Sequence, residues 1–152
     1  MPEIRQATTS DVPALVPLVK QYWTFEHLEG FDAGRIADGL TRLLTMAHLG
    51  NGWIALAGGE AAGYLLAVYV FSLEHAGRTA EIDEFFVLPE HRGKGIGESL
   101  LAAAERQFIA LGCTNSSLQI GRDNAAARRF YHRHGYTDRD DFELLDKTLI
   151  EP

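Results

Sequence analysis

Apolar residues recur along this chain with two different periods, and the changes between them predict its secondary structure. Spacings of three and four residues indicate amphipathic helices, and short apolar runs bounded by turn residues indicate strands. The predicted elements are strand 4–7, helix 12–23, helix 36–47, strands 53–57, 62–71 and 80–88, helix 96–111, strand 116–120, helix 125–134, and final strands at Tyr136 and 142–149. This order predicts one α/β domain of the α+β type, residues 1–152, in which a mixed, mostly antiparallel sheet has helices on both faces.

Composition narrows the class of protein. The chain has 152 residues, of which 46% are apolar and 23% charged, as expected for a single globular domain with a substantial core. No apolar run approaches the ~20 residues of a membrane span, and the N-terminus lacks a signal pattern. Cys113 is the single cysteine and cannot form an internal disulfide. We therefore expect a cytoplasmic protein without a membrane partner.

Charge and histidine spacing exclude two further kinds of ligand. The formal net charge is −7, so nucleic acid would be repelled and a cationic substrate attracted. The six histidines show no ligand spacing, so we expect no metal. The sequence leaves open whether the chain acts alone or as a homodimer.

A glycine-rich turn, Arg92-Gly93-Lys94-Gly95-Ile96-Gly97, joins the strand that stops at Pro89 to the helix that begins near Ile96. Such a turn presents unpaired backbone N–H groups at the positive end of a helix dipole. Arg92 and Lys94 add charge, so the turn is expected to bind a phosphate group. The Gly-Lys-Ser/Thr of a P-loop is absent, and Glu98 occupies the position of the last glycine in a dinucleotide fingerprint.

The remaining pattern, Arg-x-x-Gly-x-Gly after a strand ending Phe-Phe-Val-Leu-Pro, resembles the GNAT superfamily of acetyl-CoA-dependent N-acetyltransferases. The resemblance implies a GNAT-like fold and acetyl-CoA as co-substrate. It implies that the backbone of the turn holds the pyrophosphate and that the end of the strand pairs with the cofactor. The cofactor-binding residues implied here are Phe85, Phe86, Val87, Arg92, Gly93, Lys94, Gly95, Ile96, Gly97 and Glu98.

A second stretch, Asn124-x-x-Ala127-x-x-Phe130-Tyr131-x-x-x-Gly135-Tyr136, is similar to the GNAT helix that packs beside the pantetheine arm. Asn124 stands at the predicted helix start, and Ala127 and Tyr131 share a helical face. The resemblance implies cofactor contacts for Asn124, Ala127 and Tyr131, with Tyr131 as the general acid toward the leaving thiolate. The alternative is that Tyr131 is an aromatic core residue.

Acetyl transfer to an amine with a pKa near ~10.4 requires a base, and the strand before the turn carries Glu81, Asp83 and Glu84. Strict alternation would put Glu81 and Asp83 on one face and Glu84 on the other, unless a bulge intervenes. The family usually has a bulge here. The strand is also similar to that of diamine acetyltransferases, which carry Glu-Asp where this chain has Asp-Glu. This makes Asp83 the leading base and Glu84 an amine contact, with Glu81 a further candidate; each carboxylate could instead be a solvated edge charge.

The connection between the first two helices places Glu26 and Glu29 among aromatic residues, where they could bind a cationic amine. We therefore predict an N-acetyltransferase that acts on a small-molecule primary amine, with Glu26, Glu29, Asp83 and Glu84 binding the substrate. An ordinary solvated loop is the alternative for this connection. A protein or peptide acetyltransferase, or a non-catalytic acyl-CoA-binding module, is the alternative for the whole chain.

Overall fold

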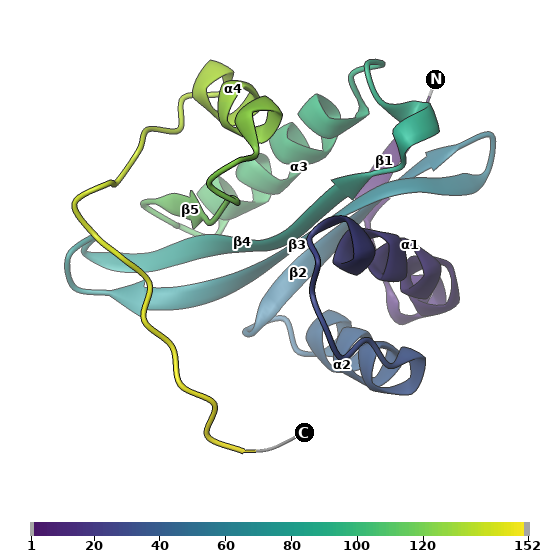
Figure 1. Cartoon of the computed structure of the whole chain (residues 1–152), viewed down its shortest axis with the longest axis horizontal. Helices are drawn as coiled ribbons and strands as arrows, with labels where there is room; N and C mark the ends of the chain where they lie inside the picture. Colours follow the sequence, from purple (N-terminus) through teal and green to yellow (C-terminus); the bar gives the residue numbers. More distant parts are fainter. Residues whose placement is uncertain (1, 151–152) are drawn as a thin grey trace. The chain divides into compact units, whose positions relative to one another are not determined.

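The computed structural model describes residues 2–150, and the chain divides into two compact units, the first ending at Gln119 and the second beginning at Ile120. The first unit contains β1 (Glu3–Gln6), η1 (Thr9–Asp11), α1 (Val12–Phe25), α2 (Ala33–Thr45), β2 (Gly50–Ala57), β3 (Glu60–Ser72), β4 (Gly77–Val87), η2 (Pro89–His91), α3 (Ile96–Ala110) and β5 (Ser116–Leu118) (Figure 1). The second unit contains α4 (Ala125–Arg133).

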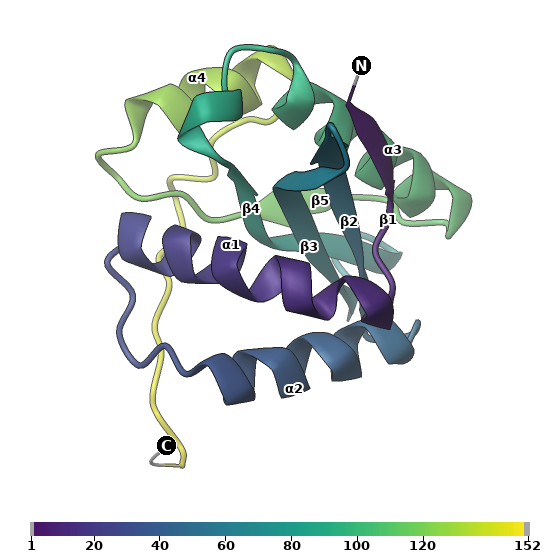
Figure 2. The same cartoon turned by 90° about the vertical axis from the view of Figure 1, so that its right-hand side faces the viewer.

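The first unit is built on a five-stranded sheet in the order β1-β2-β3-β4-β5. Neighbouring strands are antiparallel except β4 and β5, which are parallel and are joined through α3. Figure 2 shows α1 and α2 on one face of the sheet and α3 on the other. This confirms the predicted mixed, mostly antiparallel sheet with helices on both faces.

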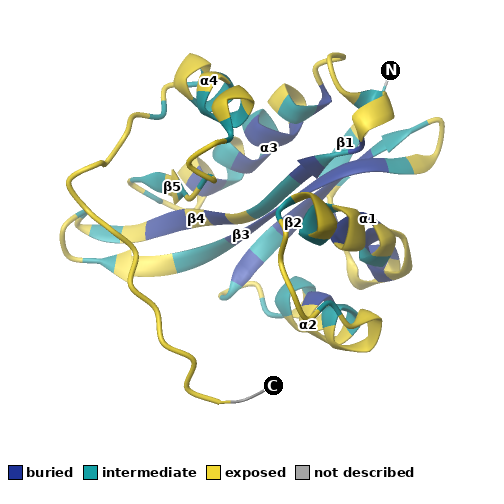
Figure 3. Ribbon diagram, viewed as in Figure 1, coloured by how far each residue is buried: buried dark blue, intermediate teal, exposed yellow. Residues whose placement is uncertain are grey.

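Each face of the sheet has its own hydrophobic packing. Under α1 and α2, the buried cluster includes Leu15, Leu18, Val19, Leu40, Ile54, Tyr64, Leu66 and Phe86. On the α3 face, Trp53 and Tyr69 pack edge-on against Phe108, with ring centroids 5.8 and 6.1 Å apart. Figure 3 shows buried positions concentrated in the strands and in the helix sides that face them. The two sets of contacts hold α1 and α3 against opposite faces of a closely packed sheet.

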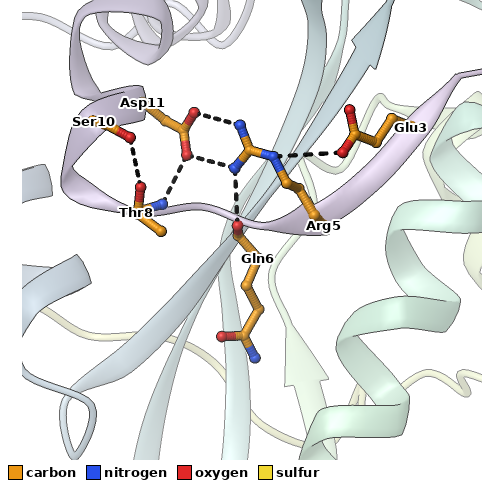
Figure 4. A network of polar contacts seen from close by, with 6 residues as sticks. All are labelled: Glu3, Arg5, Gln6, Thr8, Ser10 and Asp11. Atoms are coloured by element: carbon orange, nitrogen blue, oxygen red, sulfur yellow. Dashed lines mark hydrogen bonds and ion pairs between the residues drawn. The ribbon is translucent and has the colours of Figure 1, made fainter.

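A charged network fixes the N-terminal strand to the start of α1 (Figure 4). Arg5 donates two hydrogen bonds of 2.8 Å to the Asp11 carboxylate, which also accepts the backbone N–H of Thr8 at 2.8 Å. Asp11 is buried, and the Arg5 guanidinium holds its pKa below the usual range. The pair orients the chain as it enters α1, the helix that supplies one wall of the candidate site.

Two sequence expectations differ from the structure. The loop expected between the strands predicted at 62–71 and 80–88 is shorter in the structure, because β3 and β4 remain paired as far as Ser72 and Gly77 and only residues 73–76 form the turn. The final strands predicted at Tyr136 and 142–149 are absent, and residues 137–150 are all exposed, as Figure 3 shows for the tail of the chain. Its large apolar residues, Phe142, Leu144, Leu145, Leu149 and Ile150, are 63–88% exposed. A strand requires a paired neighbour, which an apolar pattern cannot supply by itself.

Candidate active site

The glycine-rich turn has the backbone conformation that phosphate binding requires. Gly93 and Gly95 adopt φ angles of +75° and +83°, which side chains other than glycine rarely tolerate. The first N–H groups of a helix have no intrahelical acceptor. In α3 the N-cap residue is Gly95, which has no side chain that could accept their hydrogen bonds. A Cβ built at Gly93 or Gly95 would meet no atom within 4 Å, which shows that the space before the turn is open. The turn therefore has the open backbone conformation expected of a phosphate-binding turn.

Arg92 follows η2 in the sequence, and its side chain lies between the last residue of β4 and the last residue of α1. Its Nε donates a hydrogen bond of 2.9 Å to the Val87 carbonyl, and its guanidinium lies 5.4 Å from the ring centre of Phe25 and 5.3 Å from that of Phe86. These groups border a hollow of about 320 Å³. The hollow is lined by Lys20, Gln21, Thr24, Phe25, Phe86, Pro89 and Arg92. It thus combines an apolar floor with two cationic side chains.

A β-bulge in β4 determines where its carboxylates lie. Glu84 is opposite Leu66 of β3 and Ile82 is opposite Ala67, so Asp83 is an additional residue in the strand. Cross-strand partners share a face of a sheet, and Leu66 belongs to the cluster under α1. Glu84 therefore faces α1, and the pairing of Glu81 with Val68 places Glu81 on the same face. Strict alternation, which separates Glu84 from Glu81, is wrong at this point, and the bulge implied by the family resemblance is present.

Glu84 is held by two neutral donors. Its Oε1 accepts a hydrogen bond from the Tyr64 hydroxyl and its Oε2 accepts one from the Trp23 indole N–H, both at 2.8 Å. Burial raises the pKa of Glu84, the two hydrogen bonds act in the opposite direction, and the charge of Asp83 adds to the rise. The result is a half-buried carboxylate with both oxygens fixed in position.

Asp83 and Glu26 complete an acidic group around Tyr22. The Asp83 side chain is exposed, yet the surrounding protein removes enough of its hydration to raise its pKa. Burial raises the pKa of the Tyr22 hydroxyl, and the charges of Glu26, Glu84 and Asp83 raise it further. Three of the predicted carboxylates, Glu26 at the end of α1 and Asp83 and Glu84 in the bulge, therefore raise the pKa of the same tyrosine hydroxyl. Glu29 is exposed in the α1–α2 connection.

Tyr22, Trp23 and Tyr64 belong to this site although the sequence pattern assigns them no role there. The pattern marks Tyr22 and Trp23 only as apolar positions of the first helix, and Tyr64 as part of a strand. A buried tyrosine hydroxyl or indole N–H requires an acceptor, and a carboxylate on the neighbouring strand supplies it. That requirement is a signal in the sequence, but it does not identify the partner.

In the second unit, Asn124 is the N-cap of α4, as predicted, and its Oδ1 accepts the Ala127 backbone N–H at 3.0 Å. The Tyr131 ring packs edge-on against Phe130 and Tyr136, with centroids 5.3 and 5.5 Å apart. Tyr131 is thereby held half-buried on the helix.

Metal-binding clusters and membrane-spanning helices are both missing from the described part of the chain. Within residues 2–150, no group of three histidine, cysteine or acidic side chains could hold a metal ion. The same residues contain no helix that is both long and apolar enough to cross a membrane.

A sheet with this topology, a glycine-rich turn after β4 and a bulged acidic strand are together the features expected of an acyl-CoA-dependent transferase. Comparison with known proteins then identifies the family, because the acetyltransferase (GNAT) family model matches residues 14–136. The chain therefore belongs to the GNAT family, and the family resemblance seen in the sequence is confirmed.

Individual relatives support this assignment. The chain is 34% identical to an aminoalkylphosphonate N-acetyltransferase of Salmonella typhimurium over 134 residues, 88% of this chain and 84% of that protein. An integron cassette protein from a salt-marsh metagenome matches with a TM-score of 0.86 and 28% identity, over 98% of this chain and 91% of that one. An aminoglycoside N-acetyltransferase in complex with CoA shares the fold, with a TM-score of 0.79, 21% identity, and coverage of 100% and 94%. The chain is accordingly an acetyl-CoA-dependent N-acetyltransferase that acts on amines.

Proposed function

We propose that this enzyme transfers the acetyl group of acetyl-CoA directly to the primary amine of a small cationic acceptor. The observation that carries the proposal is the half-buried carboxylate of Glu84, fixed by Trp23 and Tyr64 beside Asp83 in the bulge of the strand that leads to the glycine-rich turn. Carboxylates in partly desolvated surroundings attract an ammonium group more strongly than solvated ones do. The net charge of −7 attracts such an acceptor from a distance.

The co-substrate contacts expected from the sequence are part of this proposal. The backbone of Gly93–Glu98 would bind the pyrophosphate, with Arg92 and Lys94 adding charge, and Phe85–Val87 would lie along the pantetheine. β5 pairs with Ala80, Glu81 and Ile82 and not with this part of β4, which supports the assignment. Asn124, Ala127 and Tyr131 complete it. The family match, residues 14–136, includes parts of both units and supports the prediction of one domain.

The carboxylates are given different roles because their surroundings differ. Both oxygens of Glu84 already accept hydrogen bonds, which suits a fixed negative charge that binds the ammonium group. Asp83 is exposed and its pKa is raised, which suits a base that takes the proton from the amine. Glu81, on the same face, is the alternative base.

Acetyl-CoA, when bound, supplies the activated acetyl thioester. In this proposal Asp83 takes the ammonium proton, so that the amine nitrogen has a free electron pair with which to form a bond to the thioester carbonyl carbon. As the carbon–sulfur bond breaks, Tyr131 gives its phenolic proton to the sulfur, and the second proton that the nitrogen loses on becoming an amide returns Tyr131 to its neutral form.

An aminoalkylphosphonate is the second candidate acceptor. The 34% identical relative is named for that substrate class. The hollow lined in part by Lys20 and Arg92 offers two cations for an anionic group. This candidate differs from the first in requiring a negative charge on the acceptor.

A panel assay distinguishes these acceptors. Release of free thiol from acetyl-CoA is measured with a diamine, a polyamine, an aminoglycoside, aminoalkylphosphonates and a peptide with a free α-amine. We expect the highest kcat/KM for a diamine or polyamine. A higher value for an aminoalkylphosphonate would select the second candidate, and a higher value for the peptide would reject a small acceptor. Binding of acetyl-CoA without thiol release from any amine would support a non-catalytic module.

A further inference from the structure

Glu84 is connected to two elements that come from distant parts of the sequence. Trp23 lies in α1, 61 residues before Glu84, and Tyr64 lies in β3, 20 residues before it. Tyr64 is fully buried and its ring packs edge-on against Tyr22. Trp23 packs edge-on against Phe31, with ring centroids 6.0 Å apart. One carboxylate is thus fixed between the helix, the sheet and the α1–α2 connection that contains Glu26 and Glu29.

We infer that Trp23 and Tyr64 are positioning residues that hold Glu84, ionised and in one orientation, against the ammonium group of the acceptor. The inference rests on the proposed function and deepens it by naming residues that control recognition of the amine. A glutamate side chain has several rotatable bonds, and a donor on each oxygen removes most of that freedom before the substrate arrives. Neither donor carries charge, so the negative charge of Glu84 remains available to the amine.

The surroundings of Glu84 explain why two donors are needed. On its own strand it has Asp83 beside it and Glu81 on the same face; Tyr22 and Glu26 act from α1 and its end, and Tyr64 acts from β3. Burial and the charge of Asp83 disfavour the charged form of Glu84. The two hydrogen bonds favour it. Loss of either donor should therefore raise the pKa of Glu84 and leave it protonated over a wider range of pH.

Kinetics of conservative variants provide the first test. Trp23→Phe and Tyr64→Phe each remove a donor and keep the ring. We expect each to lower kcat/KM for the best amine about tenfold, as for loss of one hydrogen bond to a charged group, and to shift the acidic limb of the pH profile upward. The KM for acetyl-CoA should stay unchanged. Trp53→Phe is the matched control, because Trp53 is buried against Phe108 and should leave the acidic limb in place.

A double-mutant cycle separates positioning from general structural support. In a Glu84→Gln background, Trp23→Phe should reduce amine affinity, measured by calorimetry, less than twofold further. An undiminished effect there would overturn the inference, and so would an unshifted pH profile in both single variants.

Tryptophan fluorescence provides a test that is independent of turnover. The chain contains two tryptophans, so Trp53→Phe leaves Trp23 as the only emitter. The fluorescence emission of Trp23 should change with pH as Glu84 gains or loses its proton. This pH dependence should disappear in the Trp53→Phe/Glu84→Gln variant. Addition of the best amine should move the midpoint to lower pH, because a cation favours the carboxylate. The inference would be overturned if the pH dependence of the Trp23 emission were unchanged both by Glu84→Gln and by addition of the amine. If no amine is acetylated but the Glu84-dependent titration is present, the proposed function fails while the contact itself stands.

Discussion

At the level of single residues, the structure shows that similar side chains have different tasks according to their partners. Asp11 and Asp83 are both aspartates on the N-terminal unit, but Asp11 accepts three hydrogen bonds and its pKa is lowered, whereas burial effects raise the pKa of Asp83. The first arrangement stabilises a charge that supports the fold. The second raises the pKa of a carboxylate, which is the direction that favours taking up a proton.

The Asp11 arrangement predicts a pH-dependent contribution to stability. Because the pKa is lowered in the folded state, the contribution is present above the ordinary value of 3.8 and is lost as pH falls through the folded value. Asp11→Asn should lower the free energy of unfolding at pH 7 by about 1–2 kcal/mol, since Arg5 is partly exposed. Urea unfolding from pH 7 to pH 2.5 should show this difference shrinking. The exposed Asp38→Asn on α2 serves as control, and a constant difference would indicate a packing effect instead.

At the level of elements, the junction of η2 and α3 combines two glycines of unusual conformation with an uncapped helix start. An uncapped N-terminus costs stability unless a ligand or solvent satisfies its N–H groups. In our proposal, the succession of a β-strand, a glycine turn and a helix is a binding element whose function depends on the backbone more than on side chains.

Substitution at Gly95 tests this element. Gly95→Glu places a bulky anion where the pyrophosphate would approach, and we expect the Kd for acetyl-CoA, measured by calorimetry, to rise at least about tenfold. Gly59→Glu in the β2–β3 turn is a matched control, because Gly59 has the same φ of +83° and equally open space. Backbone strain should lower the melting temperature of both variants by a similar amount, but only Gly95→Glu should weaken acetyl-CoA binding. Equal affinities would remove the turn from the cofactor site.

At the level of the whole molecule, an acidic chain must bind an anionic co-substrate and, in our proposal, a cationic acceptor. The overall field favours the acceptor, so the co-substrate depends on the local arrangement of the turn. These two contributions respond differently to salt, because long-range attraction between exposed charges is screened within ~10 Å at 0.1 M.

Charge reversal in the α1–α2 connection separates a local effect from the overall field. Glu26→Lys with Glu29→Lys should raise the KM for a polyamine severalfold and make it less dependent on salt, while the KM for acetyl-CoA stays constant. The double variant Glu60→Lys with Glu74→Lys changes the net charge by the same amount. Glu60 begins β3 and Glu74 lies in the turn that follows β3, so this pair should have a much smaller effect on the KM for the polyamine. Equal effects of the two pairs would mean that only net charge matters and that the connection does not bind the amine.

Local features are determined by the sequence itself. The glycine-rich turn, the Asn124 cap and the order of helices and strands depend on neighbouring residues, so their physical causes lie within a few positions of the chain. The mixed sheet follows from that order. The cofactor turn is accordingly recognisable from its residues alone.

Other features are decided by tertiary structure, because their causes lie in distant segments. The bulge at Asp83 depends on the pairing of β4 with β3, and it alone places Glu84 on the α1 face together with Glu81. The fixing of Glu84 requires Trp23 from another element, 61 residues away. The segment 142–149 has the pattern of a strand and forms none, since a strand exists only where a neighbour pairs with it. Pattern determines what a segment can form, and the partners that folding brings to it determine what it does form.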